Sequence, residues 1–314
     1  MLQEITAIWR QPKYTGPERR KAQRWRPRPL RVLLFCLALV TLVYVAAALW
    51  LISQETRLVF QAGATLAAGR PAFAYEQIDL PRPDGARQFA WAMPAASVRD
   101  AAPWALYLHG NAATIASQVN ISHYDQLRGL GLNVLAPEYR GFAGLAGVPT
   151  EASLTVDARA GYDYLRTVRH VPPQRIVIYG WSLGGAVAVA LASEVEQAAV
   201  ILEGAPASLL AIGQQRYPFF PISWIMRNPF EAIRRVNRIR APILFLHSTD
   251  DAVIPVAEGR RLFDAAAAPK TFVEVRGGHV HASEVDAEKF YGAIEPFLAQ
   301  HGVLPHAAAN GGSR

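Results

Sequence analysis

The sequence contains very little cysteine. Cys36 is the only cysteine among 314 residues, so neither an intramolecular disulfide nor a metal site built from several cysteines can form. A single cysteine also says nothing about the redox compartment. Cys36 lies inside the longest apolar run of the chain, where we interpret it as an apolar filler rather than an acylation site. No internal repeat is visible.

Most of the chain also lacks an excess of charge of either sign. The formal net charge of +7 is typical of nucleic-acid-binding proteins, but its distribution argues against that function. Residues 1–31 hold nine of the 32 Lys and Arg and two of the 25 Asp and Glu, which leaves 23 of each sign in the remainder. We therefore expect a disordered basic leader over residues 1–31, a neutral body, and no nucleic-acid partner.

One long apolar run follows this leader. Residues 32–52 contain no charge and are interrupted only by Thr41 and Tyr44, and as a helix they would span roughly 30 Å, the thickness of a bilayer core. A buried core helix or a cleaved signal peptide would also be apolar, and residues 46–48 are small enough for a signal peptidase. The run is longer than a signal-peptide core of about 7–15 residues, and no polar cleavage region follows it.

We therefore predict an uncleaved transmembrane signal anchor at residues 32–52, through which the protein binds the membrane. The basic residues before it predict a cytoplasmic N-terminus. The body would then lie on the far side of the membrane, which is periplasmic or extracytoplasmic in a bacterium.

Beyond the anchor, strand-like and helix-like segments alternate from about Phe73 onward. This rhythm predicts an α/β fold, with a mostly parallel sheet flanked by helices. The strand-like segments are residues 105–108, 132–136, 175–179, 198–202, 242–247 and 271–275, and the helical ones are 113–130, 151–168, 186–192 and 284–299. We expect one domain over residues 53–300 and a flexible tail at 301–314.

Residues 205–235 depart from this alternation, because aromatic residues and prolines are concentrated there. A loop folded onto the body would explain part of this composition. The segment follows a strand at the edge of the sheet where ligands bind in such folds, so we predict a small lid over an apolar substrate pocket. The expected pocket residues are Tyr217, Phe219, Phe220 and Trp224.

The strongest motif is Gly180-Trp181-Ser182-Leu183-Gly184, which has the form G-x-S-x-G. It lies between a strand-like run and an alanine-rich helix, the context in which the motif forms a sharp turn that exposes a nucleophilic serine. A serine between two glycines can also be a simple turn, but the flanking strand and helix favour a nucleophile.

A serine nucleophile needs a base, and the base needs an acid that fixes its tautomer. In this fold the chain order is Ser, acid, His, and loops with Asp250, Asp251, His279 and His281 follow the last two strand-like segments. We predict Ser182 as the nucleophile, Asp251 as the acid and His279 as the base.

The alternatives stay open at this point. Asp251 is preferred over Asp250 because it stands four residues before Pro255, which is the spacing of the D-x-x-V-P element of this fold, while Asp250 is expected to cap the turn. His279 follows a glycine pair directly, whereas His281 is expected at the surface. Glu203 is a further candidate for the acid. The two histidines suggest no metal site, because no third ligand is apparent, and we expect no cofactor.

An oxyanion hole requires two backbone N–H donors. We predict the N–H of Leu183, which follows the nucleophile, and the N–H of Asn111 (or Ala112) in the turn after the first core strand. His109 precedes this turn, and we expect a structural role for it.

These motifs resemble the α/β-hydrolase family, and within it the membrane-anchored α/β-hydrolase domain-containing proteins. The resemblance covers about residues 57–300 and is carried by Leu58–Gln61, Leu108–Ala112, Glu138–Phe142, Gly180–Gly185, Ile201–Gly204 and the two loops that bear the acid and the base. It implies the α/β-hydrolase fold and a serine hydrolase acting on carboxylic esters or thioesters. Where this branch usually has glycine before the acid, the chain has Ser248.

The sequence therefore predicts a membrane-anchored serine hydrolase that cleaves ester or thioester bonds of an apolar acyl substrate, such as a lipid or an acylated protein. A serine peptidase or amidase is the alternative among enzymes, and it would need a polar pocket for the substrate amine. A catalytically silent membrane scaffold of the same fold is the alternative among binding proteins. Such a scaffold would be expected to lack a triad residue, and none is missing.

Overall fold

The computed structural model describes residues 29–63, 68–82, 85–97, 102–267 and 269–305. Most of the expected leader and the tail from residue 306 onward lie outside these residues. The chain divides into two units, Met1–Leu49 and Trp50–Arg314. The first described helix, α1 (Pro29–Phe60), begins in the first unit and ends in the second.

Within the described residues, α1 is one helix that is long and apolar enough to cross a membrane, by length and composition. It extends eight residues beyond Ile52, the expected end of the anchor. The extension is explained by packing within the second unit, where Glu55 and Phe60 are buried.

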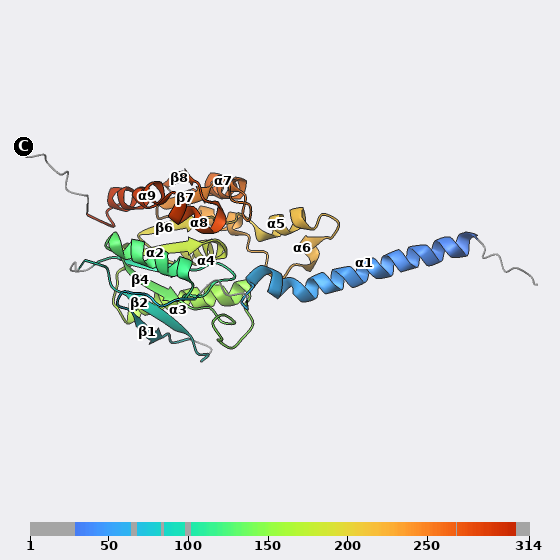
Figure 1. The fold of residues 1–314 in the computed structure, drawn as a ribbon, viewed down its shortest axis with the longest axis horizontal. Coiled ribbons are helices and arrows are strands. Elements are labelled where there is room, and N and C mark those ends of the chain that lie inside the picture. The colour runs from blue at the N-terminus through green and yellow to red at the C-terminus, as the bar shows by residue number, and fades with distance from the viewer. Residues whose placement is uncertain (1–28, 64–67, 83–84, 98–101, 268, 306–314) are drawn as a thin grey trace, which may run out of the picture. The chain divides into compact units, whose positions relative to one another are not determined.

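An eight-stranded sheet forms the centre of the second unit (Figure 1). Its order is β1-β2-β4-β3-β5-β6-β7-β8; β2 pairs antiparallel with both β1 and β4, and every other neighbouring pair is parallel. The strands are β1 (Glu76–Asp79), β2 (Phe89–Met93), β3 (Trp104–Leu108), β4 (Asn133–Pro137), β5 (Ile176–Trp181), β6 (Ala199–Glu203), β7 (Ile243–Ser248) and β8 (Lys270–Val275). The predicted α/β fold with a mostly parallel sheet is confirmed.

Helices cover both faces of this sheet. They are α2 (Gln118–Gly129), α3 (Glu151–Thr167), α4 (Leu183–Ala192), α5 (Leu209–Arg216), α6 (Ile222–Ile225), α7 (Val256–Ala265), α8 (Gly278–Val285) and α9 (Ala287–Gln300), with short 3₁₀ turns η1 (Pro173–Arg175), η2 (Ala232–Arg234) and η3 (Val236–Arg238). One buried cluster joins the sheet to α3, α4, α7 and the end of α1, and a second joins its other face to α2, α8 and α9.

Alternation along the strands creates these two cores. In β3, for example, Leu106 and Leu108 belong to the first cluster, whereas Ala105 and Tyr107 belong to the second. Successive side chains of a strand point to opposite faces, so a strand buried on both faces must be apolar throughout. Most of the central strands read as continuous apolar runs for this reason.

Three element boundaries differ from the expectation. Helix α2 begins at Gln118 rather than near residue 113, because residues 110–117 form a turn. The closing helix is two helices, α8 and α9, separated at Asp286. Strands β1 and β2 were not expected individually.

Because β3, β5, β7 and β8 are parallel, their carboxyl ends lie at one edge of the sheet, and the turns that follow them meet there.

Candidate active site

Ser182 lies in the sharp turn between β5 and α4. Its backbone has φ 55° and ψ −122°, a left-handed conformation that is strained for a residue with a side chain. The two glycines of the motif permit close approach of the chain. A Cβ atom on Gly180 would lie 2.4 Å from the carbonyl oxygen of Gly184, and one on Gly184 would lie 2.0 Å from the carbonyl oxygen of Leu108. The turn therefore requires glycine at both positions.

A hydrogen-bonded chain of three side chains begins at this serine. Ser182 Oγ lies 2.7 Å from His279 Nε2, and His279 Nδ1 lies 2.6 Å from Asp251 Oδ2. Ser182 and Asp251 are buried, with 5% and 8% of their surface exposed. In the neutral tautomer with a proton on Nδ1, His279 donates to Asp251 and accepts from the serine hydroxyl. The structure thus brings together the three residues that the sequence singled out.

Asp251 is held by the loop after β7. Its Oδ1 accepts hydrogen bonds from the N–H groups of Val253 and Ile254, both at 2.8 Å, which leaves Oδ2 for His279. The Nε2 atom of a second histidine, His247, lies 3.7 Å from Asp251 Oδ2 and 2.8 Å from the carbonyl oxygen of Ile254. Burial lowers the pKa of His247, which favours the neutral form of this ring.

Asp250 points to the neighbouring loop instead. It accepts from the Ser248 hydroxyl at 2.6 Å and from the Gly277 N–H at 3.1 Å, and Ser248 Oγ accepts from the Gly278 N–H at 3.0 Å. The hydrogen bond from Ser248, followed by that from Gly278, holds the pKa of Asp250 below its ordinary value. Asp250 and Ser248 therefore tie the acid loop to the glycine turn before His279. Ser248, the residue that departs from the family pattern, takes part in this tie.

The other candidates lie outside the hydrogen-bonded chain. His281 is exposed on α8 and pairs with Glu284 at 3.1 Å. His279 occupies the first turn of α8 rather than a loop, so the two histidines, two positions apart on a helix, point in different directions.

Glu203 belongs to a buried cluster. Its carboxylate lies 3.0 Å from His123 Nε2 and accepts a hydrogen bond of 2.6 Å from the Tyr179 hydroxyl. Burial lowers the pKa of His123, but the attraction of Glu203 and its hydrogen bond outweigh burial, so that this pKa is raised. Because the carboxylate of Glu203 is engaged with His123 and Tyr179, its side chain is not the partner of His279.

The turn after β3 carries the other predicted oxyanion donor. The N–H of Ala112 donates to the Phe60 carbonyl at 3.2 Å, and the Asn111 side chain donates to the Val59 carbonyl at 3.1 Å. Among the interactions of the described residues, neither the Asn111 nor the Leu183 backbone N–H is engaged. Asn111 and Leu183 both line the cavity that contains Ser182. Of the two donors that the sequence left open, only Asn111 thus has its N–H available.

His109, which precedes this turn, is fully buried. Its Nε2 lies 2.9 Å from Glu138 and its Nδ1 lies 2.8 Å from the Gly110 carbonyl. Both ring nitrogens are occupied within the fold, so the geometry gives His109 a structural role.

A cavity of about 570 Å³ opens at Ser182, a size typical of small-molecule sites. We call it the Ser182 cavity. Its lining is mostly aliphatic, and it comes from the end of α1, from α5 and α6, and from the loop after β7. The lining residues are Leu51, Ile52, Glu55, Leu58, Val59, Gln61, Asn111, Ser182, Leu183, Leu209, Ile212, Gly213, Arg216, Tyr217, Ile222, Ile225, Met226, Ala252, Val253 and Ile254.

Only one of the four expected aromatic residues lines this cavity. Tyr217 does so, whereas Phe219, Phe220 and Trp224 do not. Phe219 and Trp224 are 84% and 86% exposed. The reason is local: α6 is a single turn of four residues, and it directs Ile222 and Ile225 to the cavity. The pocket is apolar as expected, but through aliphatic side chains.

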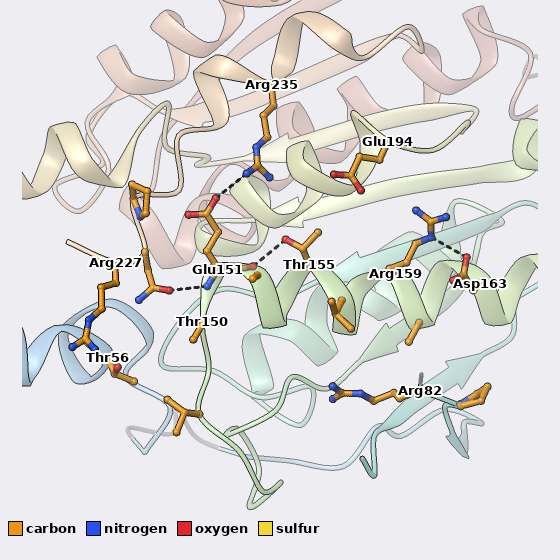
Figure 2. A pocket seen from close by; sticks show the side chains of 17 residues that line it. Thr56, Arg82, Thr150, Glu151, Thr155, Arg159, Asp163, Glu194, Arg227 and Arg235 are labelled. Carbon is orange, nitrogen blue, oxygen red and sulfur yellow. Dashed lines mark hydrogen bonds and ion pairs between the residues drawn. The ribbon is translucent and has the colours of Figure 1, made fainter. Parts of the chain in front are cut away.

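A larger cavity of about 1080 Å³ lies elsewhere, along α3. Figure 2 shows its charged side chains, with Arg235 paired to Glu151 and Arg159 paired to Asp163. Ser182, Asp251 and His279 are not among its lining residues. The described residues contain no group of three or more His, Cys, Asp or Glu side chains that could hold a metal ion.

The end of α1 was missed as part of the site. A signal was present, because Glu55 is the only acidic residue between Glu18 and Glu76 and stands three residues after the end of the apolar run at Ile52. A lone acidic residue at the end of an apolar helix indicates a specific partner. In the structure Glu55 is buried and bonded to Arg227 and Asn228.

Known proteins of several organisms are similar to this chain. A model of the α/β hydrolase family matches residues 105–236. The chain is 34% identical over 270 residues to the uncharacterized protein Rv2307c of Mycobacterium tuberculosis, covering 85% of this chain and 95% of that one. It is 30% identical to the α/β-hydrolase domain-containing protein WAV2 of Arabidopsis thaliana, with coverage of 65% and 71%.

It is also 32% identical to the lysophosphatidylserine lipase ABHD12 of Danio rerio, over 56% of this chain and 50% of that protein. Among solved structures, the esterase Pf2001 of Pyrococcus furiosus superimposes with a TM-score of 0.63 at 20% identity, over 75% of this chain and 95% of that one. At that identity the likeness concerns the fold. From the family model, the relative WAV2 and the fold together, the chain belongs to the α/β-hydrolase family.

Proposed function

We propose that the protein is a membrane-anchored serine hydrolase that cleaves carboxylic ester or thioester bonds of apolar acyl substrates. The observation that carries this proposal is the hydrogen-bonded chain from Asp251 through His279 to Ser182, with 2.6 Å and 2.7 Å between the atoms. Acid, base and hydroxyl stand in the relation that activates a serine.

In the proposed mechanism, Ser182 Oγ attacks the carbonyl carbon of the substrate while His279 Nε2 takes the hydroxyl proton. Asp251 keeps the other ring nitrogen protonated and stabilises the imidazolium that forms. The tetrahedral oxyanion accepts hydrogen bonds from the N–H groups of Leu183 and Asn111. His279 then gives its proton to the leaving alcohol or thiol, and the acyl group remains on the serine.

Deacylation repeats these steps with water. His279 takes a proton from the water, the resulting hydroxide attacks the acyl-enzyme, and the serine regains its proton as the acid leaves. No metal or other cofactor is required at any step. The Ser182 cavity, whose wall includes the 56% exposed Val253, is the proposed path for this water.

The substrate class is inferred from the aliphatic lining of the Ser182 cavity. Such a lining favours an acyl chain over the polar or charged groups of a peptide. The relative ABHD12 is named as a lipase of lysophosphatidylserine, which agrees with hydrolysis of an acyl ester. We therefore favour a lipid or an acylated protein as substrate.

The direct test is labelling with a fluorophosphonate, whose phosphonyl oxygen would occupy the oxyanion hole. The full chain should be labelled and should hydrolyse p-nitrophenyl esters, and Ser182→Ala should abolish both. Ser193→Ala is the matched control and should keep both, because Ser193 lies at the other end of α4 and its hydroxyl donates to the Ala190 carbonyl. A folded native protein that takes no label would support the silent scaffold instead.

We further propose that α1 anchors the protein with its N-terminus in the cytoplasm. The apolar length of α1 and the nine basic residues at 1–31 support this orientation. A reporter enzyme that is active only outside the cytosol, fused after Arg314, should then be active. Activity of a cytosolic reporter alone at the same position would contradict this orientation.

A further inference from the structure

The last turns of α1 do more than connect the anchor to the body. Five side chains over two and a half turns, from Leu51 to Val59, line the Ser182 cavity. Leu51 and Ile52, which close the apolar run, are among them. Leu58 is 42% exposed although it is a large aliphatic residue. An apolar side chain on the wall of a cavity is available for contact with an apolar ligand.

The wall lined by α5 and α6 is aliphatic too. Its apolar side chains are those of Leu209, Ile212, Ile222, Ile225 and Met226, and Gly213, Arg216 and Tyr217 line it as well. The cavity is therefore lined by apolar side chains from α1 and from the lid helices, with Ser182 also on its lining. An apolar lining of this kind suits a hydrocarbon chain, whereas a peptide would leave its amide groups unpaired there.

The lid side is tied to α1 by a buried carboxylate. Glu55 Oε1 accepts hydrogen bonds from the backbone N–H groups of Arg227 and Asn228 at 2.7 Å and 2.8 Å, and from the Asn228 side chain at 3.1 Å. Its Oε2 accepts from the Arg227 guanidinium at 3.1 Å. Residues 227–228 follow the lid helix α6 after Met226, so these bonds connect the wall formed by α1 to the lid side.

The same helix end also holds the oxyanion turn. Its last carbonyls, those of Val59 and Phe60, accept from the Asn111 side chain and the Ala112 N–H. The last carbonyls of a helix have no partner within the helix, so this turn caps them. The N–H of Ala112 is therefore engaged in this cap, whereas the N–H of Asn111 is available to the substrate.

We propose that residues 51–61 of α1 form the acyl-binding wall of the active site, so that the acyl chain of the substrate lies between α1 and the lid helices α5 and α6. This inference rests on the proposed serine hydrolase. It gives the anchor helix a second role, because the residues that end the apolar span also begin the acyl site.

The test is a chain-length profile of the full protein in detergent. We would measure kcat/KM for p-nitrophenyl esters from four to twelve carbons for the native protein, Leu58→Trp and Arg57→Trp. An indole at residue 58 would occupy the acyl cleft, so we expect a loss of about tenfold or more for the long esters and less than about twofold for the short ones, on the scale of a few methylenes in an apolar pocket.

Arg57→Trp is the matched control, because Arg57 is the preceding residue on the same helix, is exposed and does not line the cavity. It should leave the whole profile unchanged. A uniform loss at all chain lengths in Leu58→Trp, or a profile identical to that of Arg57→Trp, would overturn the inference.

A second variant shows where the chain lies if it is not against α1. Val253 lines the cavity from the loop after β7, and Val253→Trp should leave the preference for chain length unchanged. If Val253→Trp alone shortens the accepted chain, the acyl group lies along that loop and the inference is wrong. Labelling by a small fluorophosphonate separates these outcomes from failure of the proposed function, since native protein that takes no label would refute the hydrolase itself.

Discussion

The backbone of Ser182 provides a prediction that concerns stability rather than turnover. A residue with a Cβ atom at φ 55° and ψ −122° stores on the order of 1–3 kcal/mol of strain. Glycine would relieve that strain, because it has no Cβ atom. Ser182→Gly and Ser182→Ala both remove the attacking oxygen and its hydrogen bond to His279. They differ only in the Cβ atom, so comparing them isolates the strain.

The expected difference follows from two opposing terms. Relief of strain favours glycine by about 1–3 kcal/mol, whereas the greater freedom of glycine in the unfolded chain costs about 0.4–1 kcal/mol. The balance is a gain of about 1 kcal/mol for Ser182→Gly over Ser182→Ala, which corresponds to a rise in Tm of about 2–4 °C for a domain of this size.

The measurement is thermal unfolding of the full chain in one detergent, followed by tryptophan fluorescence. The same pair of substitutions at Ser193, where φ is −74° and ψ is −10°, is the control. That conformation is ordinary, so the glycine variant should there be the less stable by about 0.5–1 kcal/mol. If Ser182→Gly melts at or below the temperature of Ser182→Ala, the serine is not strained and our account of the turn fails.

The remaining predictions concern the acid and the base. Asp251→Asn should lower kcat by about 10³–10⁴, because an amide no longer stabilises the imidazolium or its tautomer, whereas Asp250→Asn should lose at most about tenfold, since it disturbs only the tie to the glycine turn before His279. His279→Ala should abolish ester hydrolysis while His281→Ala retains it, because His281 is exposed and paired with Glu284; an inactive His281→Ala with an active His279→Ala would refute the assignment of the base.

Local constraint explains why the nucleophile turn could be predicted from the sequence. No residue with a Cβ atom can replace Gly180 or Gly184, because that atom would lie too close to a backbone carbonyl oxygen. A short motif therefore defines the turn. The order of Ser182, Asp251 and His279 along the chain could likewise be used to predict that they form one site. Parallel strands place their carboxyl ends at one edge of the sheet. Residues that follow different strands can therefore be predicted to lie near one another even when the distances between them are unknown.

Other parts of the site depend on contacts that the sequence does not encode locally. The choice between Asp250 and Asp251 rested on spacing to Pro255, while the structure separates them by what each accepts, namely the Gly277 N–H for one and the His279 ring for the other. The prediction of the aromatic lid residues was wrong for a different reason. A cluster of aromatic residues indicates burial on average, but a four-residue helix has too few positions to bury every large side chain, and Trp224 faces solvent.

The end of α1 was the least predictable part, because hydropathy marks the end of an apolar run but not the end of a helix. Leu51 and Ile52 belong to a run that is long and apolar enough to span a membrane. Nothing in the sequence shows whether their side chains contact lipid or a substrate chain. These two environments have the same chemistry. If the acyl chain of the substrate lies against this helix, as we propose, one apolar stretch serves both, and only the hydrogen bonds of Glu55 to residues 227–228 mark where the span becomes the site.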